Sequence, residues 1–351
     1  MGADGAVARR SLEDFVAAVF ETLRVPPKDA RAVAGLMAQA DALGYDTHGV
    51  FRLRQYANRL RDGGCNPRAR PSVVSETMAT ALVDGDNGLG HLAMKFACDL
   101  AMQKAGVAGI GWVGVRGGNH AGPAALYVRP QATANMIGLC AAVGSANHVP
   151  PFGGSEILLG TNPIAIAAPS GGPDPFVLDM ATTVAAMGKI KTLAQRGERM
   201  PEGWMVGRDG KPLTDPAKRD EGFLLPIGGA KGYGLSLAIG LLAGVLNGAA
   251  FGADVIDFTN DTKSPTNTGQ FVAAIDVSAF VGTAAFEAHC RQAFGTLKAS
   301  TPLPGHDSVR IPGEGRAARR AAADVGGIAL AQPLRAELDR IAAEFGVARL
   351  R

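Results

Sequence analysis

The chain has little cysteine, and its few thiols are scattered. Only four cysteines occur in 351 residues, at positions 65, 98, 140 and 290, and no two of them form a C-x-x-C pair. Sparse, unclustered thiols argue against a disulfide scaffold and favour a reducing compartment. Since the histidines and carboxylates do not cluster with them either, we expect no metal site.

The chain also has little excess charge of either sign. Charged residues make up 19% of the chain, the formal net charge is +3, and the one short basic run lies at residues 316–320. We interpret that run as a solvated helix face. This composition argues against nucleic-acid or membrane-surface partners. The N-terminal residues lack the basic and then apolar pattern of a secretory leader, so we expect a cytoplasmic protein.

One long uncharged run could be mistaken for a membrane span. Residues 232–253 carry no charge and are nominally long enough to cross a bilayer. They include six glycines and Asn247, and Lys231 and Asp254 flank them. We therefore predict a buried core helix.

The remaining composition is that of an ordinary globular chain, 47% apolar and long enough for two lobes. Helical spacing fills the first 64 residues, beginning with an N-cap at Ser11, and returns at 283–297 and 332–345. Strands and helices alternate between these regions, including a helix predicted at 182–195 and a hairpin around Asp209-Gly210. The pattern predicts a mixed α/β (α+β) fold in which both termini build a helical domain.

A dinucleotide fingerprint is present in form but incomplete. Residues 88–93 read Gly-Leu-Gly-His-Leu-Ala, which fits G-x-G-x-x-A after a strand. A Rossmann unit also needs an acidic residue at the end of the next strand, where this chain has Arg116-Gly117-Gly118. We therefore reject a Rossmann fold and interpret the glycines as a turn before a helix.

His48 and Arg52 are four residues apart, which places both on one face at the start of a helix. Reduction of a 2-oxo acid needs an acid for the oxygen and a cation for the carboxylate, and His and Arg supply them. Thr47 adds a hydroxyl beside the imidazole. From the spacing alone, a surface His–Arg pair is the commoner explanation.

Four glycine-rich polar stretches follow, at residues 117–122, 151–154, 160–163 and 228–234, and two of them carry His120 or Lys231. Such loops bring backbone N–H groups close to an anion, although any single one could be a simple turn. Asp179 ends an apolar strand, where it could cap a helix or orient an imidazole. Together these stretches indicate a ligand cleft.

These segments, taken in order, resemble the malate/L-lactate dehydrogenase family that is distinct from the Rossmann dehydrogenases. The resemblance covers nearly the whole chain and rests on the set of blocks rather than on any one. The matching blocks are Asp46-Thr47-His48-Gly49-Val50 with Arg52, Leu53 and Tyr56; Asn119-His120; Pro151-Phe152-Gly153-Gly154; Leu159-Gly160-Thr161-Asn162-Pro163; Leu178-Asp179-Met180-Ala181-Thr182; Lys231-Gly232-Tyr233-Gly234-Leu235; and Arg310-Ile311-Pro312-Gly313-Glu314.

The resemblance implies a mixed sheet at residues 117–285 that binds NAD or NADP in a non-Rossmann manner. Residues 1–116 and 286–351 would form the helical domain for substrate binding and dimerisation, in a homodimer. The implied reaction is hydride transfer between the nicotinamide and C2 of a small 2-hydroxy or 2-oxo acid of the malate, lactate, sulfolactate or ureidoglycolate type. Reduction of a cyclic 2-imino acid is the alternative, and a non-catalytic ligand-binding role is a remote one.

The resemblance also assigns roles. His48 would be the proton donor with Thr47 and Asp179 as relay partners, and His120 is its rival. Arg52 would hold the substrate carboxylate, and Lys231 would contact substrate or cofactor. The expected cofactor contacts are His120, Ala121, Gly122, Pro123, Ala124, Thr161, Asn162, Asp179, Met180, Ala181, Lys231, Arg310, Pro312, Gly313, Glu314 and Arg316.

Two positions and one segment depart from the family pattern. Thr47 replaces the usual serine, which keeps the hydroxyl and adds a methyl group, and Ala121 replaces a common phenylalanine, which opens room. The segment Ser145-Ala146-Asn147-His148 differs from the malate type and points away from malate itself. Neither the substrate nor the choice between NAD and NADP can be read from the sequence.

Overall fold

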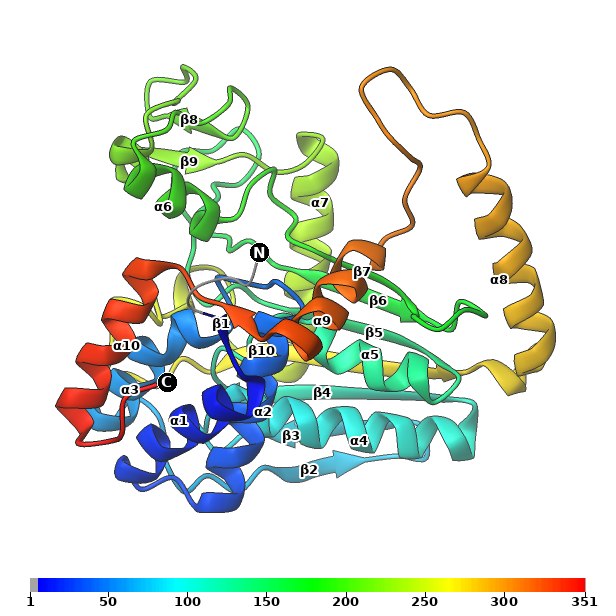
Figure 1. The fold of residues 1–351 in the computed structure, drawn as a ribbon, viewed down its shortest axis with the longest axis horizontal. Helices are drawn as coiled ribbons and strands as arrows, with labels where there is room; N and C mark the ends of the chain where they lie inside the picture. Colours follow the sequence, from blue (N-terminus) through cyan, green and yellow to red (C-terminus); the bar gives the residue numbers. More distant parts are fainter. Residues whose placement is uncertain (1–5, 351) are drawn as a thin grey trace.

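The computed structural model describes residues 6–350, and its centre is a seven-stranded sheet in the order β2-β3-β4-β10-β5-β6-β7 (Figure 1). Strand β3 runs parallel to β4, and every other neighbouring pair is antiparallel. The mixed, non-Rossmann fold is therefore confirmed. The strands are β2 (Ser72–Glu76), β3 (Thr80–Asp84), β4 (Ile110–Gly118), β5 (Met136–Ala142), β6 (Ile164–Ala168), β7 (Phe176–Met180) and β10 (Thr268–Asp276).

Strand β10 lies in the middle of the sheet and is buried on both faces over most of its length. Helices α4 (Gly90–Ala108) and α5 (Ala125–Thr133) cover one face, and α7 (Ala230–Ile239) with its continuation covers part of the other. Gly111 allows α4 to approach β4 closely, because a Cβ atom there would lie 2.1 Å from the Ala101 carbonyl oxygen. The sheet is thus a rigid platform for the loops at its ends.

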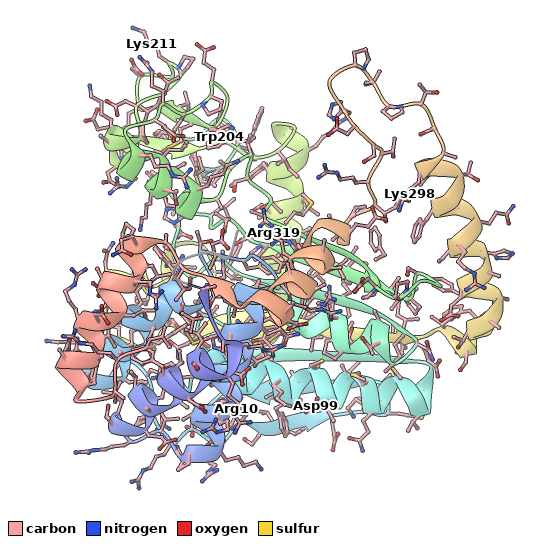
Figure 2. The ribbon with its side chains drawn as sticks, viewed as in Figure 1. Arg10, Asp99, Trp204, Lys211, Lys298 and Arg319 are labelled. Atoms are coloured by element: carbon pink, nitrogen blue, oxygen red, sulfur yellow. The ribbon has the colours of Figure 1, made fainter. Side chains whose placement is uncertain are left out.

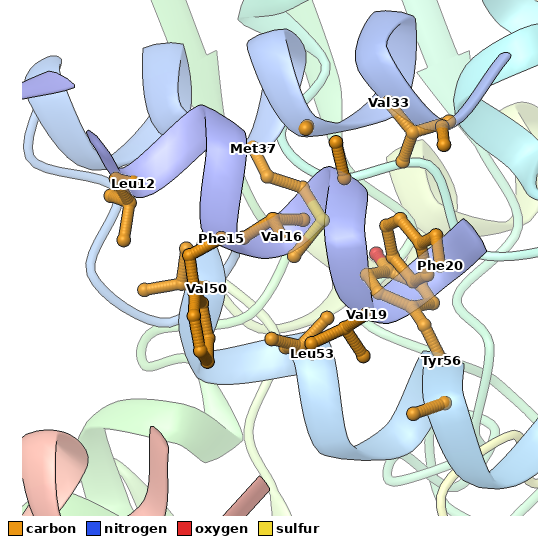
Figure 3. Packing of buried hydrophobic residues seen from close by; sticks show 14 of the residues in the cluster. Leu12, Phe15, Val16, Val19, Phe20, Val33, Met37, Val50, Leu53 and Tyr56 are labelled. Carbon is orange, nitrogen blue, oxygen red and sulfur yellow. The ribbon is translucent and has the colours of Figure 1, made fainter. Parts of the chain in front are cut away.

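The two ends of the chain meet in one helical unit. Helices α1 (Arg9–Thr22), α2 (Pro27–Ala42) and α3 (Leu53–Asp62) pack with α10 (Gln332–Phe345), and β1 (Ala6–Val7) pairs with β11 (Ile328–Ala329). Figure 3 shows Phe20 and Val19 of α1 facing Tyr56 of α3, and all three are buried. Each such side chain contributes about 1.5–3 kcal/mol to folding.

A small lobe, which we call the cap lobe, consists of α6 (Met187–Arg196), β8 (Met205–Gly207), η2 (Pro216–Glu221) and β9 (Gly222–Leu224), and it stands apart at the top of Figure 1. It has its own core, in which Ile190, Met205 and Leu224 are buried. The predicted hairpin is only partly correct, since β8 pairs mainly with β9 and meets residue 212 in a single bridge.

Helix α8 (Thr283–Lys298) projects from the body and buries none of its residues (Figure 1). Residues 299–313 then return to the sheet edge, where the Pro312 carbonyl accepts a hydrogen bond from Val177 of β7. Helix α9 (Glu314–Gly326) follows. The remaining short turns are η1 (Val50–Arg52), η3 (Gly240–Gly244), η4 (Val245–Asn247), η5 (Gly252–Asp254) and η6 (Val277–Ala279).

The structure corrects several expectations. Helix α1 begins at Arg9 and has no side-chain cap, so Ser11 is not its N-cap. The pairing of β1 with β11 fixes where that helix begins. Helix α6 begins at Met187 rather than at residue 182, because Thr182 is hydrogen-bonded to the Thr161 carbonyl. Strands β2, β3 and most of β4 belong to the sheet, although residues 1–116 were expected to form part of the helical domain.

The long apolar run is helical but less buried than expected. Among residues 6–350, the helix Ala230–Asn247 is long and apolar enough to cross a membrane by length and composition, and 39% of it is buried. Five of its large apolar side chains are exposed: Leu235, Leu241, Leu242, Val245 and Leu246. It covers the sheet with one face and presents the other outward.

Candidate active site

A cavity of about 520 Å³ lies where the helical unit, the sheet and the cap lobe meet. The helical unit contributes His48, Phe51 and Arg52 to its wall. The loop after β4 contributes residues 120–122, and the chain after β5 contributes residues 142–148. The cap lobe and the loop at 257–260 complete the wall. Segments far apart in the sequence therefore form one cleft of the size that small-molecule sites usually have.

A hydrogen bond from Asp41 fixes the turn that carries His48. The Asp41 carboxylate accepts a hydrogen bond of 2.8 Å from the Val50 N–H at the start of η1. A Cβ atom on Gly49 would lie 2.2 Å from that carboxylate, so this position requires glycine. The Thr47 hydroxyl lies 2.8 Å from His48 Nδ1, and Arg52 Nε donates to the Thr47 carbonyl at 2.9 Å. Arg52 and the imidazole are thus fixed by one short turn.

His120 is oriented by two donors at the same nitrogen. Its Nδ1 lies 2.6 Å from the Tyr56 hydroxyl and 3.4 Å from the Gly122 N–H. A backbone N–H can only donate, so Nδ1 is an acceptor and the Tyr56 hydroxyl donates to it as well. The proton of a neutral His120 is therefore on Nε2.

The two imidazoles form a stack. The His48 and His120 ring centroids are 5.6 Å apart, and Phe258 packs on the other side of His120 at 5.1 Å. Burial, followed by the charges of Arg52 and Arg316, lowers the pKa of His48 to about 3. Burial also lowers the pKa of His120 well below its ordinary value, and Arg52 and His48 add to this. Both rings are therefore neutral near pH 7 in the ligand-free protein.

Asp179 lies apart from this stack. At the end of β7, its carboxylate accepts a hydrogen bond of 3.0 Å from the Ala125 N–H at the start of α5. No hydrogen bond within residues 6–350 joins Asp179 to Thr47 or His48. Burial raises the pKa of Asp179, and the Ala125 N–H and Arg316 oppose that effect. Asp179 therefore does not cap the helix that follows it, since α6 begins at Met187 without a side-chain cap; its carboxylate instead contacts the first residue of α5.

Only some of the residues that were expected to contact the cofactor line the cavity. His120, Ala121, Gly122 and Thr161 line the cavity. Asn162 is fully buried and serves the fold, because its amide bridges Gly144 N–H and the Ser236 carbonyl. Lys231 is exposed in the first turn of α7 and is not part of the cavity wall.

The other expected cofactor contacts lie outside the cavity wall. Pro123 and Ala124 lead into α5, and Met180 and Ala181 follow Asp179. Pro312 is hydrogen-bonded to β7, and Gly313 packs against Val177, while Glu314 pairs with Lys298 at 2.7 Å. Arg310 is exposed in the loop before α9.

Arg316 is not part of a solvated face. Its guanidinium lies 3.5 Å from the centre of the Tyr45 ring and donates to the Leu43 and Gly44 carbonyls. Arg320 pairs with Asp174 at 3.2 Å. The basic run therefore binds α9 to the turn that follows α2. That turn comes immediately before the turn that carries His48. No group of three or more metal-ligating side chains occurs in the described part of the chain.

The model of the family described as malate/L-lactate dehydrogenase matches residues 7–339. The chain is 40% identical over 296 residues to the L-sulfolactate dehydrogenase of Methanocaldococcus jannaschii, which covers 84% of this chain and 85% of that protein. It is 34% identical over 312 residues to a delta(1)-pyrroline-2-carboxylate reductase of Ancylobacter novellus, covering 89% and 90%. A solved structure of sulfolactate dehydrogenase from M. jannaschii superposes with a TM-score of 0.90 at 36% identity, over 97% of this chain and 98% of that one.

The chain belongs to the malate/L-lactate dehydrogenase family. Like the named relatives it is an oxidoreductase, and the resemblance inferred from the ordered blocks is confirmed. The sequence analysis assigned no role to Tyr56, which contacts His120, or to Lys191, Arg219 and Phe258 of the cavity wall. Tyr56 is four residues after Arg52 on the same helix face and could have been found by spacing. The other three come from distant elements and left no local signal.

Proposed function

We propose that the protein is a nicotinamide-dependent oxidoreductase that transfers a hydride between the cofactor and C2 of a small 2-hydroxy or 2-oxo acid. The observation that carries the proposal is the pair of stacked imidazoles, His48 and His120, beside Arg52 in one cavity. A CH–OH donor with an adjacent carboxylate needs one cation and one proton acceptor at this spacing. The pyrroline-2-carboxylate reductase among the relatives supports a cyclic 2-imino acid as the second candidate.

Arg52 is the proposed carboxylate anchor. Its Nε is committed to the Thr47 carbonyl, which leaves the guanidinium NH₂ groups for a substrate. A guanidinium stays charged in proteins and can bind a carboxylate with two parallel hydrogen bonds. Because the same hydrogen bond ties Arg52 to the His48 turn, the anchored acid would lie beside the imidazoles.

The two histidines suit different tasks. The Thr47 hydroxyl can accept a hydrogen bond from the Nδ1–H of His48, which leaves His48 Nε2 free to exchange the proton of the substrate oxygen. His120 already carries its proton on Nε2 because Tyr56 donates to Nδ1, so it suits a neutral hydrogen-bond donor to the same oxygen. We therefore assign proton exchange to His48 and polarisation of the C–O bond to His120.

The cavity fits the flat ring of a nicotinamide. Small residues line one wall at 142–146, and the loop at 120–122 presents backbone rather than bulky side chains. The bound cofactor would supply the hydride acceptor or donor. His120, Ala121, Gly122 and Thr161 would hold its nicotinamide end, and the residues around Asp179 and Arg316 would hold its remainder. A homodimer in the cytoplasm completes the proposal.

A substrate panel tests the function. Wild-type protein is incubated with NAD(H) or NADP(H) and with pyruvate, oxaloacetate, the matching 2-hydroxy acids and a cyclic 2-imino acid, and nicotinamide absorbance is followed. We expect turnover with at least one 2-oxo or 2-hydroxy acid. Turnover of the imino acid alone would establish the second candidate, and no absorbance change with any compound would favour a ligand-binding role.

A further inference from the structure

The cavity holds more positive charge than a single carboxylate requires. Arg52 lies on the wall from the helical unit, while Lys191 of α6 and Arg219 of η2 reach the cavity from the cap lobe. Lys191 and Arg219 are half-buried. Arg52 and Arg219 both lower the pKa of Lys191, after burial, so the three cations repel one another across one space.

Lys191 has no hydrogen-bond or ion-pair partner within residues 6–350. Arg219 is held only weakly, by the Pro216 carbonyl at 3.5 Å and by Asp220 at 3.7 Å, and the Asp220 side chain is 84% exposed. A half-buried cation without a partner costs free energy that an anionic ligand can recover. The cap lobe therefore presents two available cations to the cavity.

The carboxylates of the cavity offset the three cations only in part: Asp257 and Asp220 raise the pKa of Lys191, but burial, Arg52 and Arg219 lower it more. Asp257 uses both of its oxygens within its own loop, accepting from Thr259 N–H at 2.8 Å and from the Asn260 side chain at 2.8 Å. His148 lines the same cavity, and burial lowers its pKa, so it adds no further charge near pH 7. Three cations against two carboxylates leave an excess of one positive charge.

We propose that Lys191 and Arg219 form a second anion subsite, which receives a carboxylate or sulfonate carried by the substrate beyond C2. This rests on the proposed function, because Arg52 must bind the first carboxylate. The preferred substrates are then dianionic 2-oxo or 2-hydroxy acids, and the cap lobe determines that preference. Phosphate groups of the cofactor are the other possible source of anionic charge, and the experiment separates the two.

The test compares two four-carbon acids, oxaloacetate and 2-oxobutyrate, which differ in the second carboxylate, with 3-sulfopyruvate as a sulfonate probe. For the wild type we expect kcat/KM to be roughly 10- to 100-fold higher for the dianions, as for loss of one charged hydrogen-bonded contact. Lys191→Met and Arg219→Gln should each reduce the ratio of dianion to monoanion kcat/KM by a similar factor. Lys191→Arg should restore most of it.

Matched controls lie in the same lobe. Lys218→Gln removes the exposed neighbour of Arg219, and Lys211→Met removes a lysine at the outer end of the cap lobe (Figure 2). Neither should change the ratio. The proposal is overturned if Lys191→Met slows both acids equally, or if it raises the KM of the cofactor instead of the substrate. Failure of the proposed function is a different result, namely no turnover of any acid by the wild type.

Discussion

At the scale of single residues, the candidate site contains two neutral imidazoles, and each is oriented by a different hydrogen-bond partner. Thr47 pairs with His48, and Tyr56 pairs with His120, although the two rings stack at 5.6 Å. Burial near Arg52 disfavours the charged form of both rings. A neutral His48 is ready to accept the proton of a hydroxy acid. An anionic substrate bound to Arg52 would offset that cation and favour the protonated ring needed for reduction.

The first prediction separates the roles of the histidines. His48→Asn should reduce kcat by about 10²–10⁴-fold, because it removes the group that exchanges the proton. His120→Ala should cost about 10²–10³-fold, as for loss of one preorganised hydrogen-bond donor. Cofactor binding, measured by fluorescence titration, should be nearly unchanged in His48→Asn. His289→Asn, which alters an exposed histidine of α8, is the control. Near-normal turnover in His48→Asn would assign proton exchange to His120.

The second prediction concerns pH. The pKa of His48 is lowered to about 3 by burial, so this ring is already deprotonated in the free enzyme throughout the range from about pH 5 to 8. The kcat/KM for oxidation of a hydroxy acid, which reports on the free enzyme, should therefore show no inflection in that range. An inflection near the ordinary histidine value that disappears in His48→Asn would show that the ring is more hydrated than its position indicates.

Residue identities at the site were only partly predictable. His48, Arg52 and Thr47 are neighbours in sequence, so helical spacing could group them. Lys191, Arg219 and Phe258 reach the cavity from separate elements, and a single sequence contains no trace of such contacts. Asp179 was assigned a relay role by resemblance, whereas its carboxylate is hydrogen-bonded to Ala125 at the start of α5.

At the scale of elements, the end of α2 supports the turn that carries His48. Asp41, in the last turn of α2, lies under Gly49 and holds the Val50 N–H. Burial raises the pKa of Asp41 to about 8, although the Val50 hydrogen bond opposes this. A carboxylate near a helix C-terminus is also disfavoured by the helix dipole when it is charged. The protonated form of Asp41 therefore stabilises the fold more than the ionised form does.

The third prediction follows from the sign of that shift. A carboxyl whose pKa is higher in the folded than in the unfolded state contributes stability below about pH 4, and this contribution is lost as the pH rises to about 8. Asp41→Asn keeps an acceptor for Val50 without an ionisable group. Its Tm should exceed that of the wild type by a few degrees at pH 8, and by less at pH 5. Asp339→Asn, on the exposed side of α10, is the control. An equal Tm difference at both pH values would contradict the prediction.

Some element boundaries are determined by tertiary contacts, so the local sequence pattern did not predict them. The alternation of strands and helices in the middle of the chain was predicted correctly, since their apolar periodicity is strong. The start of α1 was wrong because backbone pairing of Val7 with Ile328, more than 300 positions away, determines it. The partner of β8 is β9, beyond a long turn, whereas a short-range hairpin signal indicated residues 211–213.

At the scale of the whole molecule, an unexplained feature is the apolar outer face of the helix Ala230–Asn247. Its exposed side chains include Leu242 and Leu246, which are 40% and 63% accessible. Contiguous apolar faces of this kind usually mark an interface. The other side of the same helix packs on the sheet that bears the cavity loops. A second copy of the chain against this face would make assembly and active-site geometry depend on one another.

The fourth prediction is that this face joins two subunits. Wild-type protein should have twice the mass of the 36.0 kDa chain by light scattering, and Leu242→Glu with Leu246→Glu should reduce it to a single chain. Val325→Glu, at a side chain that is 93% accessible on α9, should leave the mass unchanged. A monomeric wild type, or a double variant that remains dimeric, would assign the face to another role.

The two-stranded pairing of β1 with β11 has a consequence for biosynthesis. The N-terminal helices are made first, yet their unit includes β11 and α10 from the end of the chain, and Arg54 of α3 pairs with Glu337 of α10. Domains generally acquire structure as they leave the ribosome, beginning at the N-terminus. Here the segment that carries His48 and Arg52 cannot complete its packing before β11 and α10 have been made. We therefore expect a nascent chain to lack the complete cavity wall until both of these elements have left the ribosome.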